Sequence, residues 1–133
     1  MSDFSLSKRS DDHWFTPLSL YNSLNAEFNF DDDPCPIHGE DVDNGLKREW
    51  GKSIFMNPPY SNPAPWVHRA FLESLKGKIV VGLLRGDTST KWFHDWVWKK
   101  AEIRFIRGRL KFGNQNGPAP FAPIIAIWNG GKQ

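Results

Sequence analysis

The chain has 133 residues, of which 39% are hydrophobic and 24% charged, and both values are ordinary for one globular domain with a single core. Its one cysteine, Cys35, excludes an internal disulfide and is typical of a reducing compartment. No stretch approaches the roughly eighteen consecutive apolar residues of a membrane-spanning helix, and the polar start lacks the apolar core of a secretory signal. We expect a frayed tail over residues 1–12 and one domain over residues 13–133, located in the cytoplasm.

The first predicted element is a helix over residues 17 to about 25. Thr16 can cap it, and Pro17 suits its first position because a helix start leaves that backbone N–H unpaired anyway. Apolar residues recur here at spacings of two to four positions, namely Leu18, Leu20, Tyr21, Leu24 and Phe28. The alternation of apolar and polar residues over 28–31 predicts a strand after the helix.

Three carboxylates, Asp31, Asp32 and Asp33, follow this predicted strand. Because they repel one another, they favour a site for a hydroxyl-rich ligand or a cation such as Mg²⁺ or Ca²⁺. A solvated acidic turn is the plain alternative. Cys35 and His38 have too few neighbouring ligands for a zinc site, and we predict no metal.

A short strand and a proline arch follow over residues 53–60. Ser53, Ile54, Phe55 and Met56 supply the composition of a buried strand, and the two prolines after Asn57 end its pairing because neither has a backbone N–H. Residues 57–60 are therefore a stiff arch at the carboxyl end of a strand, where open α/β sheets bind ligands.

The arch has the groups to hold a planar amine. The Asn57 amide oxygen and the Pro58 carbonyl are acceptors, Pro59 has no competing N–H, and Tyr60 adds an aromatic face. Two acceptors beside a stacking surface suit a base with an exocyclic amine, such as adenine. The plain alternative is a proline-rich turn with a buried tyrosine.

A helix over residues 66–75, ended by Gly77, and an apolar run over residues 78–84 come next. The run is typical of a strand buried on both faces. Strand, helix and strand in this order predict a parallel pair with a right-handed crossover.

Beyond this unit, the sequence predicts a helix capped by Thr88 or Ser89 and ending near Trp98, then strands over residues 102–106 and 122–128. Residues 107–112 continue the first of these strands, and the loop over residues 113–120, which is rich in Gly, Asn and Pro, leaves no room for a crossover helix. These strands should therefore form an antiparallel pair.

Charge is distributed unevenly, although the net charge is only +2. Residues 1–65 hold five Lys or Arg and eleven Asp or Glu, whereas residues 66–133 hold twelve and four. Arg107, Arg109 and Lys111 recur at every second position, so in an extended segment they share one face at a spacing that suits DNA phosphates. The alternatives are a charged strand edge and halves that do not form separate faces.

These segments together resemble the phage-type DNA N-6-adenine methyltransferase family. The arch is similar to the [Asn/Asp/Ser]-Pro-Pro-[Tyr/Phe/Trp] motif of amino-group methyltransferases that use S-adenosylmethionine. The matching pieces lie between residues 14 and 128: Trp14-Phe15-Thr16-Pro17, Phe30 with Asp33-Pro34-Cys35, Gly45-Leu46 with Trp50, Asn57-Pro58-Pro59-Tyr60-Ser61, Trp66 with Ala70, Thr88-Ser89-Thr90-Lys91-Trp92-Phe93-His94, Gly108-Arg109-Leu110-Lys111-Phe112 and Ala119-Pro120-Phe121. Arg85 stands where we expect a proline of the family pattern.

The resemblance implies methyl transfer from S-adenosylmethionine to the exocyclic amine of adenine in double-stranded DNA, usually for a phage or prophage in a bacterial host cell. The residues that it implies are Asn57, Pro58, Pro59 and Tyr60 for catalysis; Trp14, Thr16, Pro17, Asp31, Asp33 and Pro34 for the cofactor; and Lys91, Trp92, Arg107, Arg109 and Lys111 for DNA. An acceptor in RNA or a protein glutamine, and an inactive nucleic-acid-binding module, remain alternatives.

For the fold, the resemblance implies an α/β protein with a Rossmann-like methyltransferase sheet and helices on both faces. The twenty residues between Asp33 and Ile54 cannot hold two strands with their crossovers. We therefore expect a reduced sheet of about five strands, mostly parallel with an antiparallel C-terminal strand. Such a sheet implies either weak cofactor binding or a homodimer in which a second subunit completes the pocket.

Overall fold

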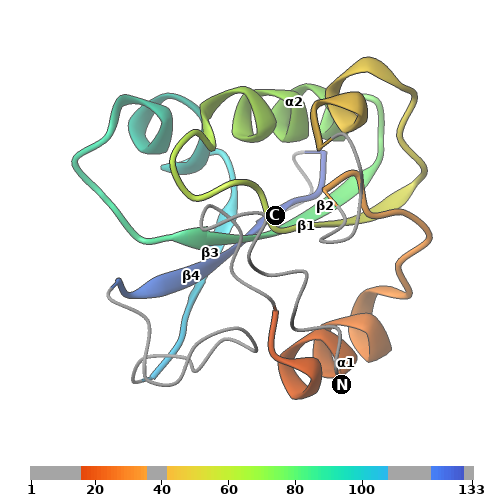
Figure 1. Ribbon diagram of the computed structural model, residues 1–133, viewed down its shortest axis with the longest axis horizontal. Helices are drawn as coiled ribbons and strands as arrows, with labels where there is room; N and C mark the ends of the chain where they lie inside the picture. Colours follow the sequence, from red (N-terminus) through yellow and green to blue (C-terminus); the bar gives the residue numbers. More distant parts are fainter. Residues whose placement is uncertain (1–15, 36–41, 108–120, 131–133) are drawn as a thin grey trace.

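The computed structural model describes residues 16–35, 42–107 and 121–130. Within these ranges the protein is built on one four-stranded mixed sheet with the strand order β1-β2-β4-β3 (Figure 1). The strands are β1 (Ser53–Met56), β2 (Ile79–Arg85), β3 (Glu102–Phe105) and β4 (Pro123–Trp128).

The strand directions bring distant parts of the chain together at one end of the strands, which we call the carboxyl edge of the sheet. β1 and β2 pair in parallel, with Met56 opposite Gly82. β4 pairs antiparallel with both β2 and β3, with Arg85 opposite Pro123. The carboxyl ends of β1, β2 and β3 therefore lie at the same edge as the start of β4. The predicted parallel unit and the antiparallel final pair are both confirmed.

Helical segments cover both faces of the sheet, as predicted (Figure 1). α1 (Leu18–Phe28) lies on one face, and α2 (Ala64–Ser74), the 3₁₀ turn η2 (Val42–Lys47) and the short π-helix η3 (Phe93–Val97) lie on the other. The predicted helix ending near Trp98 is thus largely one short π-helical segment.

Alternating side chains of the strands build two cores. Ile54 and Met56 face α2 and pack with Trp66, whereas Phe55 faces α1 and packs with Leu24. All six residues of β4 and the five central residues of β2 are buried. Burial on both faces explains why these two strands have near-continuous apolar sequences.

The predicted strand over residues 28–31 is not confirmed. Phe28 ends α1, and Asn29 then takes a left-handed conformation with φ of 54°. Only one isolated bridge, between Asp32 and Ile54, extends the sheet beyond β1. Two backbone hydrogen bonds join this segment to β1, from the Asp31 N–H to the Ser53 carbonyl and from the Phe55 N–H to the Asp32 carbonyl. The side-chain carboxylates of Asp31 and Asp32 accept the N–H groups just before and at the start of β1. The described residues therefore form four strands, and the five-stranded Rossmann-like sheet is not confirmed.

Several predicted features lie outside the described residues: the tail over residues 1–12, Trp14, His38, Arg109 and Lys111. Among the helices that are described, none has the length and apolar character to cross a membrane.

Candidate active site

The predicted acceptor arch, residues 57–60, leaves the carboxyl end of β1. Asn57 and Pro58 are buried, and Tyr60 is half-buried. The arch borders a small hollow of about 20 Å³, which is also walled by the carboxyl end of β2. The lining residues are Asn57, Pro58, Pro59, Tyr60, Pro63, Leu83, Leu84, Arg85 and Phe121.

The Asn57 side chain is held by Thr16, which lies 41 positions earlier in the chain. Its Nδ2 donates to Thr16 Oγ1 over 2.9 Å. In this arrangement the other end of the amide is the acceptor oxygen Oδ1. Asn57 itself is 7% exposed. The arch thus presents a buried and oriented amide.

Two of the three acidic residues hold the start of β1. Asp31 Oδ1 accepts from the backbone N–H groups of Lys52 at 3.0 Å and Ser53 at 3.1 Å. Asp32 accepts from the Arg48 guanidinium at 2.8 and 2.9 Å and from the Gly51 N–H at 2.8 Å. Desolvation alone would raise the pKa of Asp32, but the bonds from Arg48 and Gly51 outweigh it and hold the pKa below its usual range.

Asp33 has a different environment. Its Oδ1 accepts from the Cys35 N–H at 3.1 Å, and no ion pair joins it to a cation in the described part of the chain. The residue as a whole is exposed, yet the protein around its carboxyl group desolvates it and, with Asp32 nearby, raises its pKa to about 6. The residue therefore reaches the surface, while its carboxyl group is largely desolvated by the protein around it.

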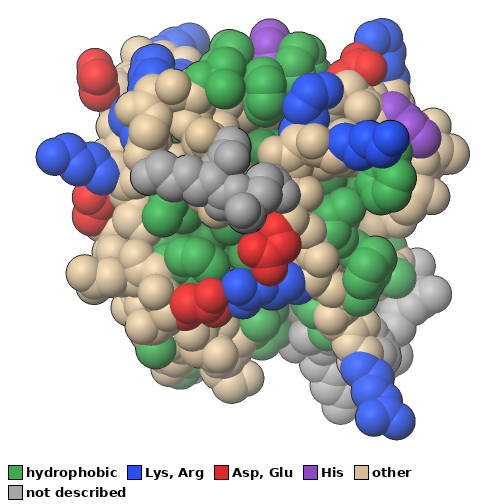
Figure 2. All heavy atoms as spheres, turned by 180° about the vertical axis from the view of Figure 1, so that it is seen from behind, with side chains coloured by type: hydrophobic (Ala, Val, Ile, Leu, Met, Phe, Trp, Pro, Cys, Tyr) green, Lys and Arg blue, Asp and Glu red, His purple; other side chains and the backbone are tan. Residues whose placement is uncertain are grey.

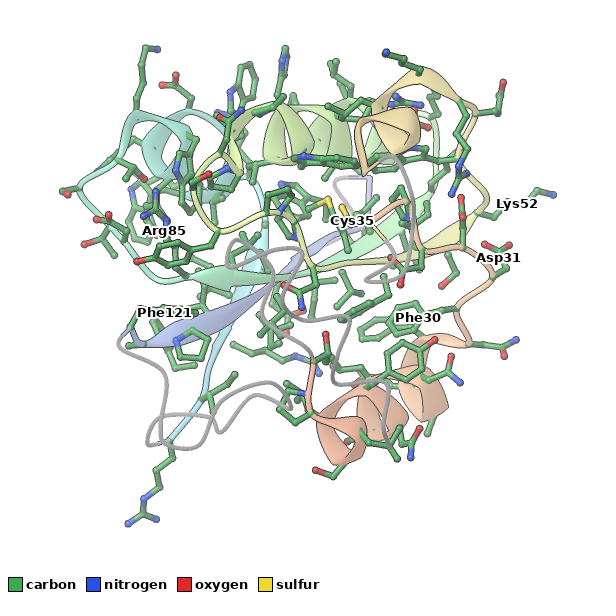
Figure 3. The ribbon with its side chains drawn as sticks, in the orientation of Figure 1. Phe30, Asp31, Cys35, Lys52, Arg85 and Phe121 are labelled. Atoms are coloured by element: carbon green, nitrogen blue, oxygen red, sulfur yellow. The ribbon has the colours of Figure 1, made fainter. Side chains whose placement is uncertain are left out.

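The segment over residues 33–35 meets the arch through Cys35. The Cys35 thiol is buried, and burial followed by the nearby Asp33 charge raises its pKa, while a hydrogen bond from the Asn57 backbone opposes this rise. Figure 3 shows Cys35 between the end of the sheet that carries Asp31 and Lys52 and the end that carries Arg85 and Phe121. Three separate sequence segments, represented by Thr16, Cys35 and Asn57, therefore converge at one point.

The described residues that were predicted to contact DNA, Lys91, Trp92 and Arg107, differ in their environments. Lys91 is exposed and pairs with Asp95, and Arg107 is exposed just beyond β3. Trp92 is only 7% exposed and packs in the core beneath η3. Its ring lies 5.9 Å from the Arg85 guanidinium carbon, so Trp92 belongs to the wall behind the hollow.

A second, larger hollow lies at the same edge of the sheet. It has a volume of about 450 Å³, and its lining, taken from η3, β3, β4 and the loop after β2, is Gly86, Thr88, Phe93, His94, Trp98, Ile103, Phe105, Ile106, Ala122, Pro123 and Ile124. Trp98 and Phe105 are 50% and 80% exposed. Figure 2 shows hydrophobic side chains at the surface among those of Lys, Arg and His. We call this hollow the apolar groove.

Sequence reasoning did not assign the groove, Arg85 or Phe121 to the site. Phe105 was read only as part of a strand, and its exposure follows from the edge position of β3, which a single sequence does not reveal. For Arg85 the sequence offered one indication of a special role, because an arginine stands where the family pattern has a proline. Among the described residues, no group of three or more His, Cys, Asp or Glu side chains is placed to hold a metal ion.

An amide, two prolines and an aromatic ring lie together at the carboxyl edge of a mixed α/β sheet, which is the arrangement expected of an amino-group methyltransferase. The comparison with known proteins makes this specific. The family model described as DNA N-6-adenine-methyltransferase (Dam) matches residues 4–122, and the chain belongs to this family.

Two curated relatives from bacteriophages carry the name DNA N-6-adenine-methyltransferase. The chain is 42% identical over 121 residues to the protein of Haemophilus phage HP1, with 80% of this chain and 70% of the relative covered. It is 32% identical over 110 residues to the protein of Escherichia phage T1, where 74% of this chain but only 46% of the relative is covered. No solved structure matches the chain significantly.

Proposed function

We propose that this member of the family transfers a methyl group from S-adenosylmethionine to the exocyclic N6 amine of adenine in double-stranded DNA, and that residues 57–60 receive the adenine. The observation that carries the proposal is the Asn57 amide, which is buried at the carboxyl edge and oriented by Thr16 over 2.9 Å. An acceptor fixed in this way needs no reorganisation when the amine arrives.

Methyl transfer requires that the lone pair of the adenine N6 nitrogen points at the methyl group. When bound, S-adenosylmethionine supplies a methyl group on a positively charged sulfur. The Asn57 oxygen and the Pro58 carbonyl accept the two amine hydrogens, and the Tyr60 ring stacks on the base. Held in this way, the nitrogen lone pair would face the methyl group that the cofactor supplies, and the methylated amine would give up one proton to solvent.

For the cofactor we propose the side of Asn57 that carries Thr16, Pro17, Asp33 and Pro34. Asp33 fits a ligand rich in hydroxyl and amino groups, because the residue reaches the surface and its carboxylate has no ion pair among the described residues. Asp31 fits less well, since its oxygens already accept two backbone N–H groups. We therefore assign the cofactor contact to Asp33 and a supporting role to Asp31.

The cofactor pocket is formed either by one chain or by two. In these two cases the affinity for S-adenosylhomocysteine depends differently on protein concentration. A pocket formed by one chain gives a weak affinity for S-adenosylhomocysteine that does not change with protein concentration. A pocket completed by a second copy gives an affinity that rises as the protein dimerises. Calorimetry over a hundredfold range of protein concentration, beside sedimentation of the same samples, separates the two.

For DNA we propose that the duplex lies along the carboxyl edge, over the arch and the apolar groove. Residues 88–107 hold five Lys or Arg and two Asp or Glu, which favours a polyanion. The exposed Trp98 and Phe105 offer stacking surfaces for unpaired bases. Because N6 cannot reach a buried amide from inside a duplex, the adenine must leave the base stack.

A transfer assay with labelled S-adenosylmethionine tests the proposal on DNA, RNA and protein in parallel. We expect label in DNA that digests to N6-methyladenine, and none with Asn57→Ala, while both proteins show the same circular dichroism. Label in RNA or in protein glutamine would replace the substrate. DNA binding without transfer to any acceptor would identify an inactive binding module.

A further inference from the structure

Arg85 is the last residue of β2 and lies directly beside the acceptor arch. Its guanidinium carbon lies 5.0 Å from the centre of the Tyr60 ring and 5.9 Å from that of Trp92. The Phe121 ring also contacts Tyr60, with ring centres 5.1 Å apart and planes inclined by 31°. Figure 3 shows Arg85 and Phe121 on the same side of the molecule. The Tyr60 ring thus already has a planar cation and an aromatic ring as neighbours.

The hollow beside Tyr60 cannot accept a base in this conformation. Its volume of about 20 Å³ has room for roughly one water molecule, whereas a purine is several times larger. At least one wall must move before adenine can stack on Tyr60.

Of the three side chains that meet at the hollow, Tyr60, Phe121 and Arg85, Arg85 is the one that can move most easily. Tyr60 follows two prolines in a stiff arch. The backbone next to Phe121 is anchored, since the Gly86 N–H donates to the Ala122 carbonyl over 2.8 Å. The close approach also needs Gly86, because a Cβ there would lie 2.6 Å from that carbonyl oxygen. Arg85 instead has a long side chain with several rotatable bonds.

Nothing polar in the described residues holds the Arg85 head group. Its Nε is buried without a hydrogen-bond partner there, and so is Nε1 of the adjacent Trp92. No ion pair of the described residues includes Arg85. Within the described ranges its cation contacts only aromatic rings, so it would gain from an anionic acceptor. The anion that arrives with an adenine in DNA is the phosphate on either side of it.

We propose that Arg85 and the target adenine exchange places. In the free protein the guanidinium occupies the space beside Tyr60 that the base needs, and on DNA binding it leaves the ring and binds a phosphate next to the extruded nucleotide. Arg85 is then a DNA-contacting residue that also excludes bases without their phosphates. The inference rests on the proposed function, because it takes residues 57–60 as the adenine site.

The alternative is that Arg85 only supports the Tyr60 ring. The two roles predict opposite changes in adenosine affinity when Arg85 is replaced. If Arg85 is a brace, its loss weakens binding of adenosine and of DNA together. If it exchanges with the base, its loss strengthens the binding of adenosine, which has no phosphate, and weakens the binding of DNA.

The test uses Arg85→Met, which keeps an apolar stem, Arg85→Lys, which keeps the charge, and Lys76→Ala as a control. Lys76 is exposed near the opposite edge of the sheet, where it pairs with Glu73. Adenosine binding is followed by NMR titration with saturating S-adenosylhomocysteine, and duplex binding is measured from 50 to 300 mM salt.

For Arg85→Met we expect adenosine to bind several-fold more tightly and DNA roughly tenfold more weakly, with a salt slope lower by about one unit. Arg85→Lys should keep the wild-type slope, and Lys76→Ala should change neither quantity. Adenosine and DNA affinities that fall together, or an unchanged salt slope, would overturn the exchange. Methylation of adenine by the wild-type preparation is assayed beside them, so a failure of the exchange is distinguished from a failure of the proposed function.

Discussion

At the scale of single residues, the acceptor amide is the group on which the proposed chemistry depends most. Thr16 orients it, the arch fixes its backbone and the core buries it. Each of these contacts removes a degree of freedom that the free side chain would have. In the proposed mechanism the acceptor is therefore restrained before the base arrives.

Asn57→Ala should lower kcat roughly a hundredfold or more while the fold is kept, because one preorganised transition-state partner is lost. Steady-state kinetics with saturating DNA and cofactor measure the effect. Asn62→Ala is the matched control, since Asn62 is an exposed asparagine just beyond the arch. Activity of Asn57→Ala within a few-fold of wild type would remove this residue from the mechanism.

Tyr60 should act through its ring. Stacking contributes about 1–3 kcal/mol per base, so Tyr60→Ala should lose roughly ten- to a hundredfold in kcat/KM. Tyr60→Phe and Tyr60→Trp should keep most of the activity. A Phe variant as impaired as the Ala variant would show that the hydroxyl has a role of its own.

Asp33 makes cofactor binding depend on pH. Its pKa is raised to about 6 in the folded protein, so it ionises across the range from pH 5 to 7. If the ionised carboxylate binds the cofactor, the affinity for S-adenosylhomocysteine should be constant above about pH 7 and fall as pH drops through 6. Calorimetry at several pH values measures this, and Asp33→Asn should bind more weakly with a flat profile.

The raised pKa of Asp33 also affects the stability of the fold, and the effect of pH on stability is opposite to its effect on cofactor binding. The folded protein holds this proton to a higher pH than the unfolded chain, so the residue costs stability as pH rises from about 4 to 6. Asp33→Asn should therefore raise the free energy of unfolding at pH 7 and leave it unchanged below about pH 4. A variant that loses both cofactor affinity and stability at pH 7 would indicate a structural role instead.

At the scale of elements, the edge position of β3 determines what the protein can offer to DNA. β3 has a neighbour on one side only, and Phe105 at its end is 80% exposed. Together with Trp98 it borders the apolar groove, which opens at the same sheet edge as the arch. Large exposed apolar side chains beside a hollow favour a binding role over a packing role.

Phe105→Ala combined with Trp98→Ala should weaken DNA binding about tenfold or more, because each ring can stack on an unpaired base. Both side chains are largely exposed, so the midpoint of thermal unfolding should change little. The control is Leu72→Ala with Leu75→Ala, two apolar residues exposed at the end of α2. Equal effects of both pairs, or loss of self-association rather than of DNA binding, would contradict this role of the groove.

At the scale of the whole molecule, charge should govern the affinity for DNA. Arg107 lies just beyond β3, at the carboxyl edge, and no ion pair among the described residues includes it. Arg107→Ala should weaken binding to all DNA sequences alike and lower the slope of log affinity against log salt by about one unit. Fluorescence anisotropy with unrelated duplexes measures both, and catalysis at saturating DNA should persist. An unchanged slope would mean that Arg107 contacts no phosphate.

The sequence by itself determined the local features of this protein. The composition of residues 53–60 was enough to predict β1 and its proline stop, because strand propensity and the missing N–H of proline act over a few residues. The order of strands and helices was enough for the parallel pair and the antiparallel ending. The family followed from motifs spread over most of the chain.

Only the tertiary structure decided which of these pieces meet. It joined Thr16 to Asn57 across 41 positions, gave Asp31 and Asp32 backbone partners in place of a fifth strand, buried Trp92 and brought Arg85 onto Tyr60. None of this was accessible from local pattern, because each contact joins segments whose separation in space is set by the packing of the whole sheet. The local elements were therefore predictable from short motifs, whereas the walls and charges of the candidate site depended on the fold.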